Sequence, residues 1–256
     1  KVAFKLKKSN NLEDMMYKAI LFFTLVLLIS CGPLRDINGI KDGTTMNLSR
    51  KGLSEIPVEV FENKNLKVLK LYGNNIKEIS ERIGELVNLE KLYIGRNDLS
   101  SLPKAIGNLK KLKVLSAQYN RIDSLPDSIG DLENLEELIL NQNTLITLPK
   151  SIGKLKKLEV LKLNINYLEK IPEEIGECEN LQFIYLNRNN LVELPKSLVN
   201  LRLLRELYVA NAGAMVYLPE ELCDLRYFET LEIDFITVVP NCLIVQRTGR
   251  LNIIQR

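Results

Sequence analysis

The feature that most constrains this chain is an arrangement of leucine, asparagine, proline and glycine that returns every 23 residues. One copy, LEELILNQNTLITLPKSIGKL, runs from residue 135 to residue 155. Leucines at its first, fourth and sixth positions are followed by Asn143, by Leu148-Pro149 and by Gly153. Related copies begin at Leu66, Leu89, Leu112, Leu158 and Leu181. A period of this length is typical of solenoids, in which each copy is one coil of a stack.

A single copy cannot bury its own leucines, whereas stacked copies cover the apolar edges of their neighbours. Leu138 and Leu140 are separated by one residue, so on a strand both side chains point to the same side. We therefore expect one short strand per copy and a parallel sheet along the stack. Each buried leucine contributes roughly 1.5–3 kcal/mol before the loss of chain entropy is subtracted.

An asparagine stands at the same place in six copies. A buried amide both donates and accepts hydrogen bonds, so it can satisfy backbone groups where the chain turns inward after the strand. We expect these side chains to lie inside and to bond their own coil and the adjacent one. The six are Asn74, Asn97, Asn120, Asn143, Asn166 and Asn189.

Proline and glycine mark the second half of each copy. Eight of the nine prolines follow an apolar residue at one place in the pattern, where proline can end an extended segment and open a short helical turn. Gly153 and its counterparts come four residues later and are expected to close that turn. None of them belongs to a G-x-G-x-x-G or P-loop pattern, so no phosphate-binding loop is predicted.

The order L-x-x-L-x-L-x-x-N-x-L, followed by L-P-x-x-I-G-x-L, resembles the leucine-rich repeat family in its 23-residue form. The resemblance covers residues 44 to about 240. It implies an α/β solenoid, a curved horseshoe with a parallel concave sheet and short helical or 3-10 turns on the convex side. It also implies a non-enzymatic scaffold for protein–protein interaction, although a fold does not by itself fix a function.

The first coil departs from the pattern. Residues 44–61 contain a truncated copy in which Lys51 occupies the asparagine position. A terminal coil has a neighbour on one side only, so an atypical first copy is expected to act as a cap.

The last coils depart from the pattern as well. The coil from Leu204 has Ala212 at the asparagine position and one extra residue within ANAGAMVY, which predicts a bulge or small loop. The coil from Phe228 is interpreted as degenerate, with Ile236 among the residues that keep the phase. Residues 241–256 are interpreted as a C-terminal cap.

Residues 15–31, MMYKAILFFTLVLLISC, have the order of an export signal. Lys18 precedes an apolar run at 19–29, which is shorter than the roughly 20 residues that a spanning helix needs. The run ends in L-I-S-C and resembles the lipobox of bacterial lipoproteins, which implies a lipid anchor on Cys31. An ordinary signal peptide that is cut near Ser30 is the alternative.

The expected organisation is an N-terminal extension and signal peptide at 1–30, a linker at 31–43 and the repeat domain at 44–256. The lipoprotein resemblance implies a bacterial cell-envelope location. The glycine after Cys31, where some lipoproteins carry an aspartate that retains them at the inner membrane, favours the outer membrane or the cell surface. If the signal is not used, the same chain is a cytoplasmic scaffold.

Charge and composition exclude several functions. Removing residues 1–30 takes five of the 35 basic and two of the 32 acidic side chains and leaves 30 of each. A neutral body gives no electrostatic case for binding nucleic acid. The chain has no histidine, which removes the imidazole general base, the histidine metal ligands and the Ser–His and Cys–His nucleophile pairs. Glutamates such as Glu136 and Glu137 are interleaved with Lys and Arg as on a solvated face. We therefore expect no catalytic site, no metal and no cofactor.

The cysteines beyond Cys31 allow two arrangements. Cys178 replaces a core leucine and is expected to be a small buried apolar residue. Cys223 and Cys242 lie about one coil apart, and in an exported protein they could form a disulfide that staples the C-terminal cap. Two free thiols fit the spacing as well, because the distance between the Cα atoms decides the matter.

The outward side chains of the expected strands form the candidate binding face. Aromatic side chains on a solvated sheet, with Lys and Arg nearby, are the usual composition of protein-binding hot spots. Strand propensity alone also favours Tyr, Val and Ile, and rows of Tyr can stack on sugar rings, so a carbohydrate or cell-wall ligand is the second hypothesis. One column holds Lys70, Tyr93, Ser116, Ile139, Lys162, Tyr185 and Tyr208, and the candidate partner-binding residues are Tyr72, Tyr93, Tyr119, Ile139, Phe183, Tyr185 and Tyr208.

Overall fold

The structure, a computed structural model, describes residues 43–245 and 251–256. The predicted signal segment, Cys31 and nearly all of the predicted linker lie outside these residues. Within the described ranges, no helix is both long enough and apolar enough to cross a membrane.

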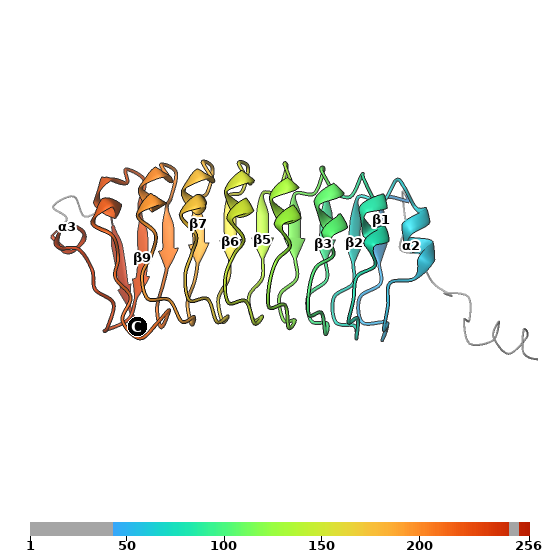
Figure 1. Ribbon diagram of the computed structural model, residues 1–256, viewed down its shortest axis with the longest axis horizontal. Helices are drawn as coiled ribbons and strands as arrows, with labels where there is room; N and C mark the ends of the chain where they lie inside the picture. The colour runs from blue at the N-terminus through green and yellow to red at the C-terminus, as the bar shows by residue number, and fades with distance from the viewer. Residues whose placement is uncertain (1–42, 246–250) are drawn as a thin grey trace, which may run out of the picture. The chain divides into compact units, whose positions relative to one another are not determined.

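Ten short parallel strands form one sheet whose order follows the chain from β1 to β10 (Figure 1). The register joins equivalent positions of successive copies, so that Leu138 pairs with Leu115 on one side and with Leu161 on the other. The parallel sheet predicted from the leucine spacing is therefore confirmed. The strands are β1 Thr45–Asn47, β2 Val68–Lys70, β3 Lys91–Tyr93, β4 Val114–Ser116, β5 Glu137–Ile139, β6 Val160–Lys162, β7 Phe183–Tyr185, β8 Glu206–Tyr208, β9 Thr230–Ile233 and β10 Asn252–Gln255.

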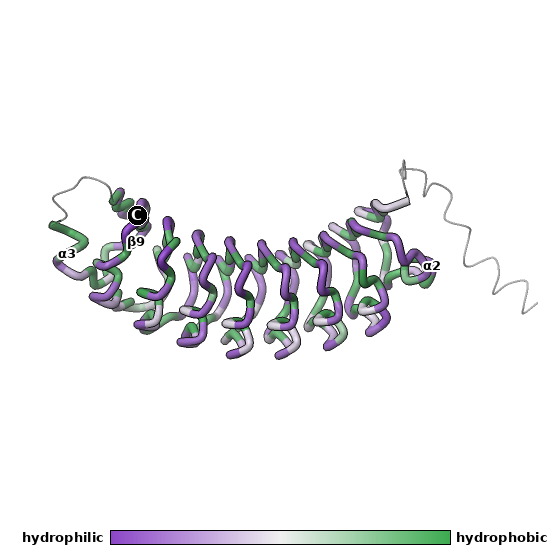
Figure 2. The backbone as a smooth tube through the Cα atoms, turned by 90° about the horizontal axis from the view of Figure 1, so that it is seen from above, coloured by the Kyte–Doolittle hydropathy of each residue, from purple (hydrophilic) through white to green (hydrophobic). Residues whose placement is uncertain are grey.

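A 3-10 turn lies on the side of each regular coil opposite the strand, on the convex side of the curved stack (Figure 2). Pro149 caps the turn at Lys150–Lys154 in an extended conformation, with ψ 149°. Proline suits this place because its φ is fixed and its missing N–H leaves no hydrogen bond unmade. The turns are η1 Glu81–Glu85, η2 Lys104–Asn108, η3 Asp127–Asp131, η4 Lys150–Lys154, η5 Glu173–Glu177, η6 Lys196–Asn200 and η7 Glu220–Asp224.

The core lies between the sheet and these turns. Leu135, Leu138 and Leu140 are fully buried, as are Ile152 and Leu155 from the turn side of the same coil. Equivalent residues are buried in the neighbouring coils, so the apolar interior is continuous along the stack.

The sequence predicted that the glycine in turns η1 to η5 ends the turn, and the structure contradicts this prediction. Gly153 lies inside η4, the turn's C-cap is Leu155, and Gly153 is not among the residues with positive φ. A Cβ atom on Gly153 would overlap the backbone carbonyl of Glu174 in the next coil, and one on Gly130 would overlap that of Ser151. The prediction was wrong because close backbone approach, and not a left-handed conformation, requires glycine here.

The six asparagines at equivalent positions of successive coils form a continuous ladder of buried amides. In Asn143, which is 6% exposed, Nδ2 donates to the carbonyls of Leu140 in its own coil and Ala117 in the preceding coil, both at 3.0 Å. Its Oδ1 accepts from the backbone N–H of Ile122 at 3.0 Å. Each amide therefore ties two coils together through three backbone groups. Neighbouring asparagines share the carbonyls, since that of Ala117 also accepts from Asn120 and that of Leu140 from Asn166.

Replacement of Asn143 by Ala is expected to lower the free energy of unfolding by about 1–3 kcal/mol, because the buried N–H of Ile122 loses its partner and two buried carbonyls each lose one of two donors. Urea unfolding followed by circular dichroism measures this loss. Asn134→Ala is the control, since Asn134 also bonds a neighbouring coil, at Lys110 O, but at the surface where water can replace it. Equal effects at the two positions would contradict the role given to the buried amide.

Helices close the described ends of the stack. Helix α2, Val58–Glu62, lies in the first coil and buries Val60 and Phe61. At the other end, helix α3, Asn241–Ile244, buries Leu243 and is followed by β10 on the edge of the sheet. The sequence had assigned capping roles to both segments.

The sequence-based predictions for the irregular coils near the C-terminal end are confirmed in part. The predicted bulge is present as turns and bends at 210–215, with Ala212 buried. Ile236 is 52% exposed and does not keep the core phase. The chain turns earlier there, because the buried carboxylate of Asp234 accepts bonds from the N–H of Ile236 and from the hydroxyl of Thr237.

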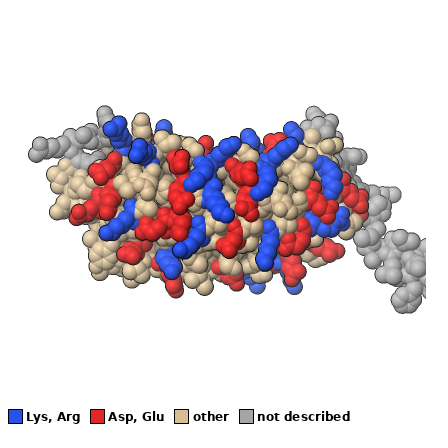
Figure 3. Space-filling model, turned by 45° about the horizontal axis from the view of Figure 1, so that its top comes forward, with Lys and Arg blue, Asp and Glu red and all other residues tan. Residues whose placement is uncertain are grey.

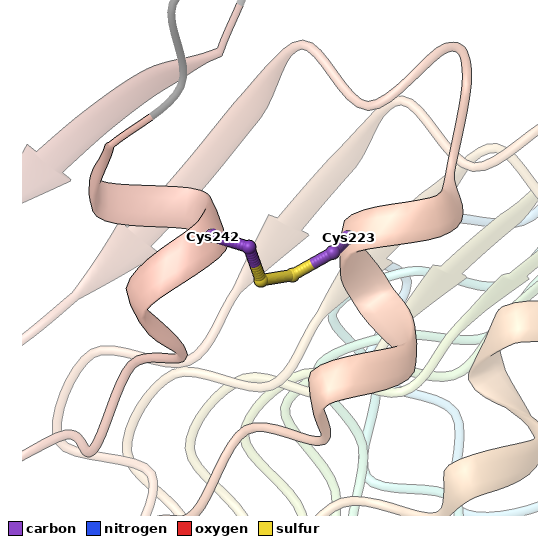
Figure 4. Close-up of a disulfide and its surroundings, with 2 residues drawn as sticks. All are labelled: Cys223 and Cys242. Carbon is purple, nitrogen blue, oxygen red and sulfur yellow. A yellow bond between two sulfur atoms is a disulfide. The ribbon is translucent and has the colours of Figure 1, made fainter.

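Of the two arrangements open for Cys223 and Cys242, a disulfide or two free thiols, the structure contains the disulfide. A disulfide joins Cys223 in η7 to Cys242 in α3, with the two Cα atoms 6.0 Å apart (Figure 4). Cys178 is a buried free thiol whose Sγ lies 3.2 Å from the carbonyl of Ile152, and burial raises its pKa to about 12.

Candidate protein-binding face

The concave sheet presents its outward side chains in columns that run along the stack. We call the column through the third residue of each strand from β2 to β9 the central column. The register places the predicted residues in it one after another: Lys70, Tyr93, Ser116, Ile139, Lys162, Tyr185 and Tyr208, with Glu232 next in line.

The other predicted residues fall in three different places. Phe183 is half-buried at the start of β7, in register with Val160 of β6. Tyr72 lies two residues after β2, and its ring lies over Gly95 of the next coil. Tyr119 belongs to no strand column: it sits in the turn after β4 with φ 57° and is 44% exposed. The sequence had wrongly grouped it with the strand residues.

Two neighbouring tyrosines of the central column, on β7 and β8, form a pair. Tyr185 and Tyr208 are stacked, with ring centroids 4.6 Å apart and planes inclined by 19°. Both hydroxyls donate to the same carboxylate oxygen, Oε2 of Glu206, at 3.1 and 3.0 Å. Nζ of Lys162 lies 5.3 Å from the centroid of Tyr185. The sequence placed these tyrosines in one column, but it did not single out Glu206, which orients both of them.

The environment of this pair favours the neutral phenols. Burial, followed by the nearby charge of Glu206, raises the pKa of Tyr185 to about 12. Burial, followed by the hydrogen bond to Glu206 and the charge of that carboxylate, raises the pKa of Tyr208. Both hydroxyls therefore remain hydrogen-bond donors through neutral pH and well above it.

An absorbance titration of the phenolate band should find Tyr185 ionising near pH 12, later than an ordinary tyrosine at about 10. Subtracting the titration curve of the Tyr185→Phe variant from that of the wild type isolates the ionisation of Tyr185. Because the folded pKa is the higher one, the stability contribution is present below about pH 10 and is lost as the pH rises toward 12. A Tyr185 that ionises together with the exposed tyrosines would contradict the buried geometry.

Family profiles match most of the repeat array. A leucine-rich repeat profile matches residues 44–99 and 156–211, and a leucine-rich repeat region profile matches 83–167. The chain is a leucine-rich repeat protein. A search of curated protein sequences found no match.

Solved structures similar to this leucine-rich repeat protein come from bacteria and plants. A leucine-rich repeat protein of Leptospira interrogans is 28% identical with a TM-score of 0.71, over 83% of this chain and 66% of that one. The ectodomain of the Arabidopsis thaliana receptor kinase GASSHO1/SCHENGEN3, in complex with CASPARIAN STRIP INTEGRITY FACTOR 2, is 32% identical with a TM-score of 0.63, over 70% and 22%. PEPR1, in the structure PEPR1-AtPEP1, is 27% identical with a TM-score of 0.69, over 83% and 35%.

This leucine-rich repeat protein thus spans just under two thirds of the Leptospira chain and a fifth to a third of the plant chains. The comparisons place it among proteins that generally serve as non-enzymatic interaction modules. Among the described residues, no group of Cys, Asp or Glu side chains is arranged to hold a metal ion.

The repeat contains a second row of asparagines that the sequence analysis missed. Oδ1 of Asn141 accepts from the backbone N–H of Asn164 at 2.8 Å, and Oδ1 of Asn164 accepts from that of Asn187 at 2.9 Å. Asn187 continues the row to the N–H of Ala210 at 2.7 Å. The 23-residue spacing of the three asparagines was the available signal. This row borders the central column and fixes the chain just after β6, β7 and β8.

Glu232 is the second acidic residue that the aromatic pattern did not reveal. It stands in the central column after Tyr208 but is only 2% exposed. Its carboxylate accepts from Nδ2 of Asn187 at 2.8 Å and lies 3.4 Å from the guanidinium of Arg256. The strand register could have placed Glu232 in the column. Its ion pair with Arg256 could not have been predicted, because it depends on β10 lying beside β9.

The flank beside the strand starts offers little to a charged ligand. Lys and Glu alternate there in pairs between coils, for example Lys113 with Glu136 at 3.5 Å and Lys67 with Glu90 at 3.3 Å. Figure 3 shows blue and red side chains interspersed over the face that it presents. Exposed pairs of this kind contribute about 0–1 kcal/mol each, so this flank is a solvated surface.

Proposed function

We propose that this leucine-rich repeat protein is an exported, lipid-anchored bacterial scaffold that binds another protein through its concave face. The observation that carries the proposal is the central column, in which Tyr93, Ile139, Tyr185 and Tyr208 stand in one register on an open sheet. Large half-buried side chains of this kind dominate binding energy in protein interfaces. Two similar plant receptor structures are complexes, that of GASSHO1/SCHENGEN3 with CASPARIAN STRIP INTEGRITY FACTOR 2 and that of RGFR1 with RGF2.

Two features support export. The segment at 15–31 has the order of a lipoprotein signal that ends at Cys31. The disulfide between Cys223 and Cys242 suits an oxidising compartment, where such bonds form and persist. A single acyl chain holds a protein to a membrane weakly, so stable anchoring needs the several chains that lipoproteins carry.

Partner capture tests the use of the face. Wild-type protein and the variant Tyr93→Ser/Ile139→Ser/Tyr208→Ser are used to recover proteins from native envelope extract, and the recovered proteins are identified by mass spectrometry. We expect the triple variant to lose a specific partner. A control variant carries Val87→Ser and Ile146→Ser, two exposed apolar residues outside the columns. If the face variant keeps every partner, the concave face is not the binding site.

Intact mass tests the anchor. Protein taken from its native membrane should begin at Cys31, carry the mass of a diacylglyceryl group and partition into detergent. Cys31→Ala should abolish both properties. Unmodified soluble protein that retains residues 1–30 would reject export and leave a cytoplasmic scaffold.

The geometry of the tyrosine pair argues against the alternative that the face binds a carbohydrate. Tyr185 has Lys162 over its ring on one side and Tyr208 stacked on the other. A sugar ring needs an open aromatic face, and this ring offers none.

A further inference from the structure

Charge is distributed unevenly along the concave face. Lys70 on β2 and Lys91 on β3 carry the positive charge of the first coils, and neither forms an ion pair with any residue that the structure describes. The charged residues that directly precede the strands pair across the rim, Lys67 with Glu90 and Lys113 with Glu136. The N-terminal half of the face is therefore basic.

The sign changes at β5. From there onward, four carboxylates lie on the face or its rim without an ion-pair partner in the described part of the chain: Glu137, Glu159, Glu206 and Glu229. Two cations lie near these carboxylates: Lys162, whose ammonium lies over Tyr185, and Arg205 on the rim. Glu232 adds no net charge because it pairs with Arg256. The C-terminal half is therefore acidic.

The row of asparagines adds donors for a peptide backbone. Oδ1 of Asn141 and Oδ1 of Asn164 are used within the sheet, whereas neither Nδ2 group donates to any described residue. Both side chains are half-buried beside the central column. Fixed amide donors along a sheet can bond the carbonyls of an extended chain.

The geometry points to an extended peptide segment with separated charges as the partner. We propose that its acidic end lies over Lys70 and Lys91 and its basic end over the carboxylates from Glu137 to Glu229. Strands lie about 4.8 Å apart and an extended chain rises about 3.3 Å per residue, so the seven steps from β2 to β9 need about ten residues. This inference rests on the proposed use of the concave face.

Two synthetic peptides of one composition test the charge pattern. In the block peptide, Glu residues stand at one end, Lys residues at the other and neutral residues between them; in the second peptide Glu and Lys alternate. Fluorescence anisotropy at low salt should find the block peptide bound at least about tenfold more tightly. The preference should disappear at about 1 M salt, where charges are screened within about 3 Å.

Charge reversal supplies the decisive variants. Lys70→Glu/Lys91→Glu should abolish the preference for the block peptide. Adding Glu137→Lys/Glu229→Lys should restore it, because the same peptide then binds in the opposite direction. Glu206 is left unchanged since it holds two tyrosine hydroxyls. Lys77→Glu/Lys104→Glu, at exposed positions outside the columns, is the matched control and should bind like wild type.

Equal binding of the two peptides, binding of neither, or no recovery in the fourfold variant would each overturn the inference. These results are distinct from failure of the proposed function. If the serine variant of the face loses its native partner while the block peptide shows no preference, the face binds a protein but charge separation does not select it.

Discussion

Replacement of Leu140 by Ala is expected to lower the free energy of unfolding by about 2–5 kcal/mol, as for other large-to-small changes in well-packed cores. Leu140 is fully buried and follows β5 in the middle of the stack, where covalently connected coils on both sides limit collapse around a cavity. Urea unfolding monitored by circular dichroism gives the value.

Ile139→Ala is the matched control for this experiment. Ile139 is the preceding residue, loses the same number of carbon atoms, and points to the concave face, where it is half-buried. Its replacement should cost about 1 kcal/mol or less, in proportion to the smaller apolar area that it withdraws from water. A larger loss at Ile139 than at Leu140 would mean that the inward and outward positions have been exchanged.

Reduction of the disulfide between Cys223 and Cys242 should lower the free energy of unfolding by about 3 kcal/mol. The bond closes a loop between residues 19 apart, and chain-entropy treatments assign about this amount to a loop of that size. Urea unfolding with and without a phosphine reductant measures the difference, and the lost stability should be greatest at α3 and β10, which the bond holds to η7.

The variant Cys223→Ala/Cys242→Ala serves as the reference. It should match the reduced wild type and should not respond to the reductant. Cys178 stays in both proteins, and its burial, which raises its pKa to about 12, keeps it from exchanging with the pair. Identical stability of the oxidised and reduced wild type would show that the bond does not hold the cap.

The periodic part of the fold could be predicted because one pattern fixes both the strand phase and its repetition. Once Leu138 and Leu140 were placed inward, register carried the assignment through the stack, and with it the central column. Asn143 could be placed inside for the same reason. Each of these inferences needs only the position of a residue within its own coil.

The features that the sequence did not predict correctly depend on contacts or backbone conformations that one coil's pattern does not specify. Gly153 is explained by the backbone of Glu174, which lies in the next coil. Ile236 was misplaced because the buried carboxylate of Asp234 redirects the chain before the expected position. Tyr119 was misplaced because a left-handed residue follows the strand, and nothing in its side chain signals this conformation. Glu206 was missed because its role follows from the two hydroxyls that converge on it.

The glycines inside the turns also control how strongly the array bends. Paired strands hold neighbouring coils about 4.8 Å apart on one side, so the radius depends on the spacing of the turns on the other. Gly130 and Gly153 allow those turns to touch backbone to backbone, whereas Val199 and Cys223 stand at the same position in η6 and η7. A cavity of about 580 Å³ lies between the ends of these last two turns. These two turns belong to the coils that carry Tyr185 and Tyr208. We therefore expect the array to bend most strongly at the tyrosine pair, so that one side chain per coil sets the radius of the surface that a ligand meets.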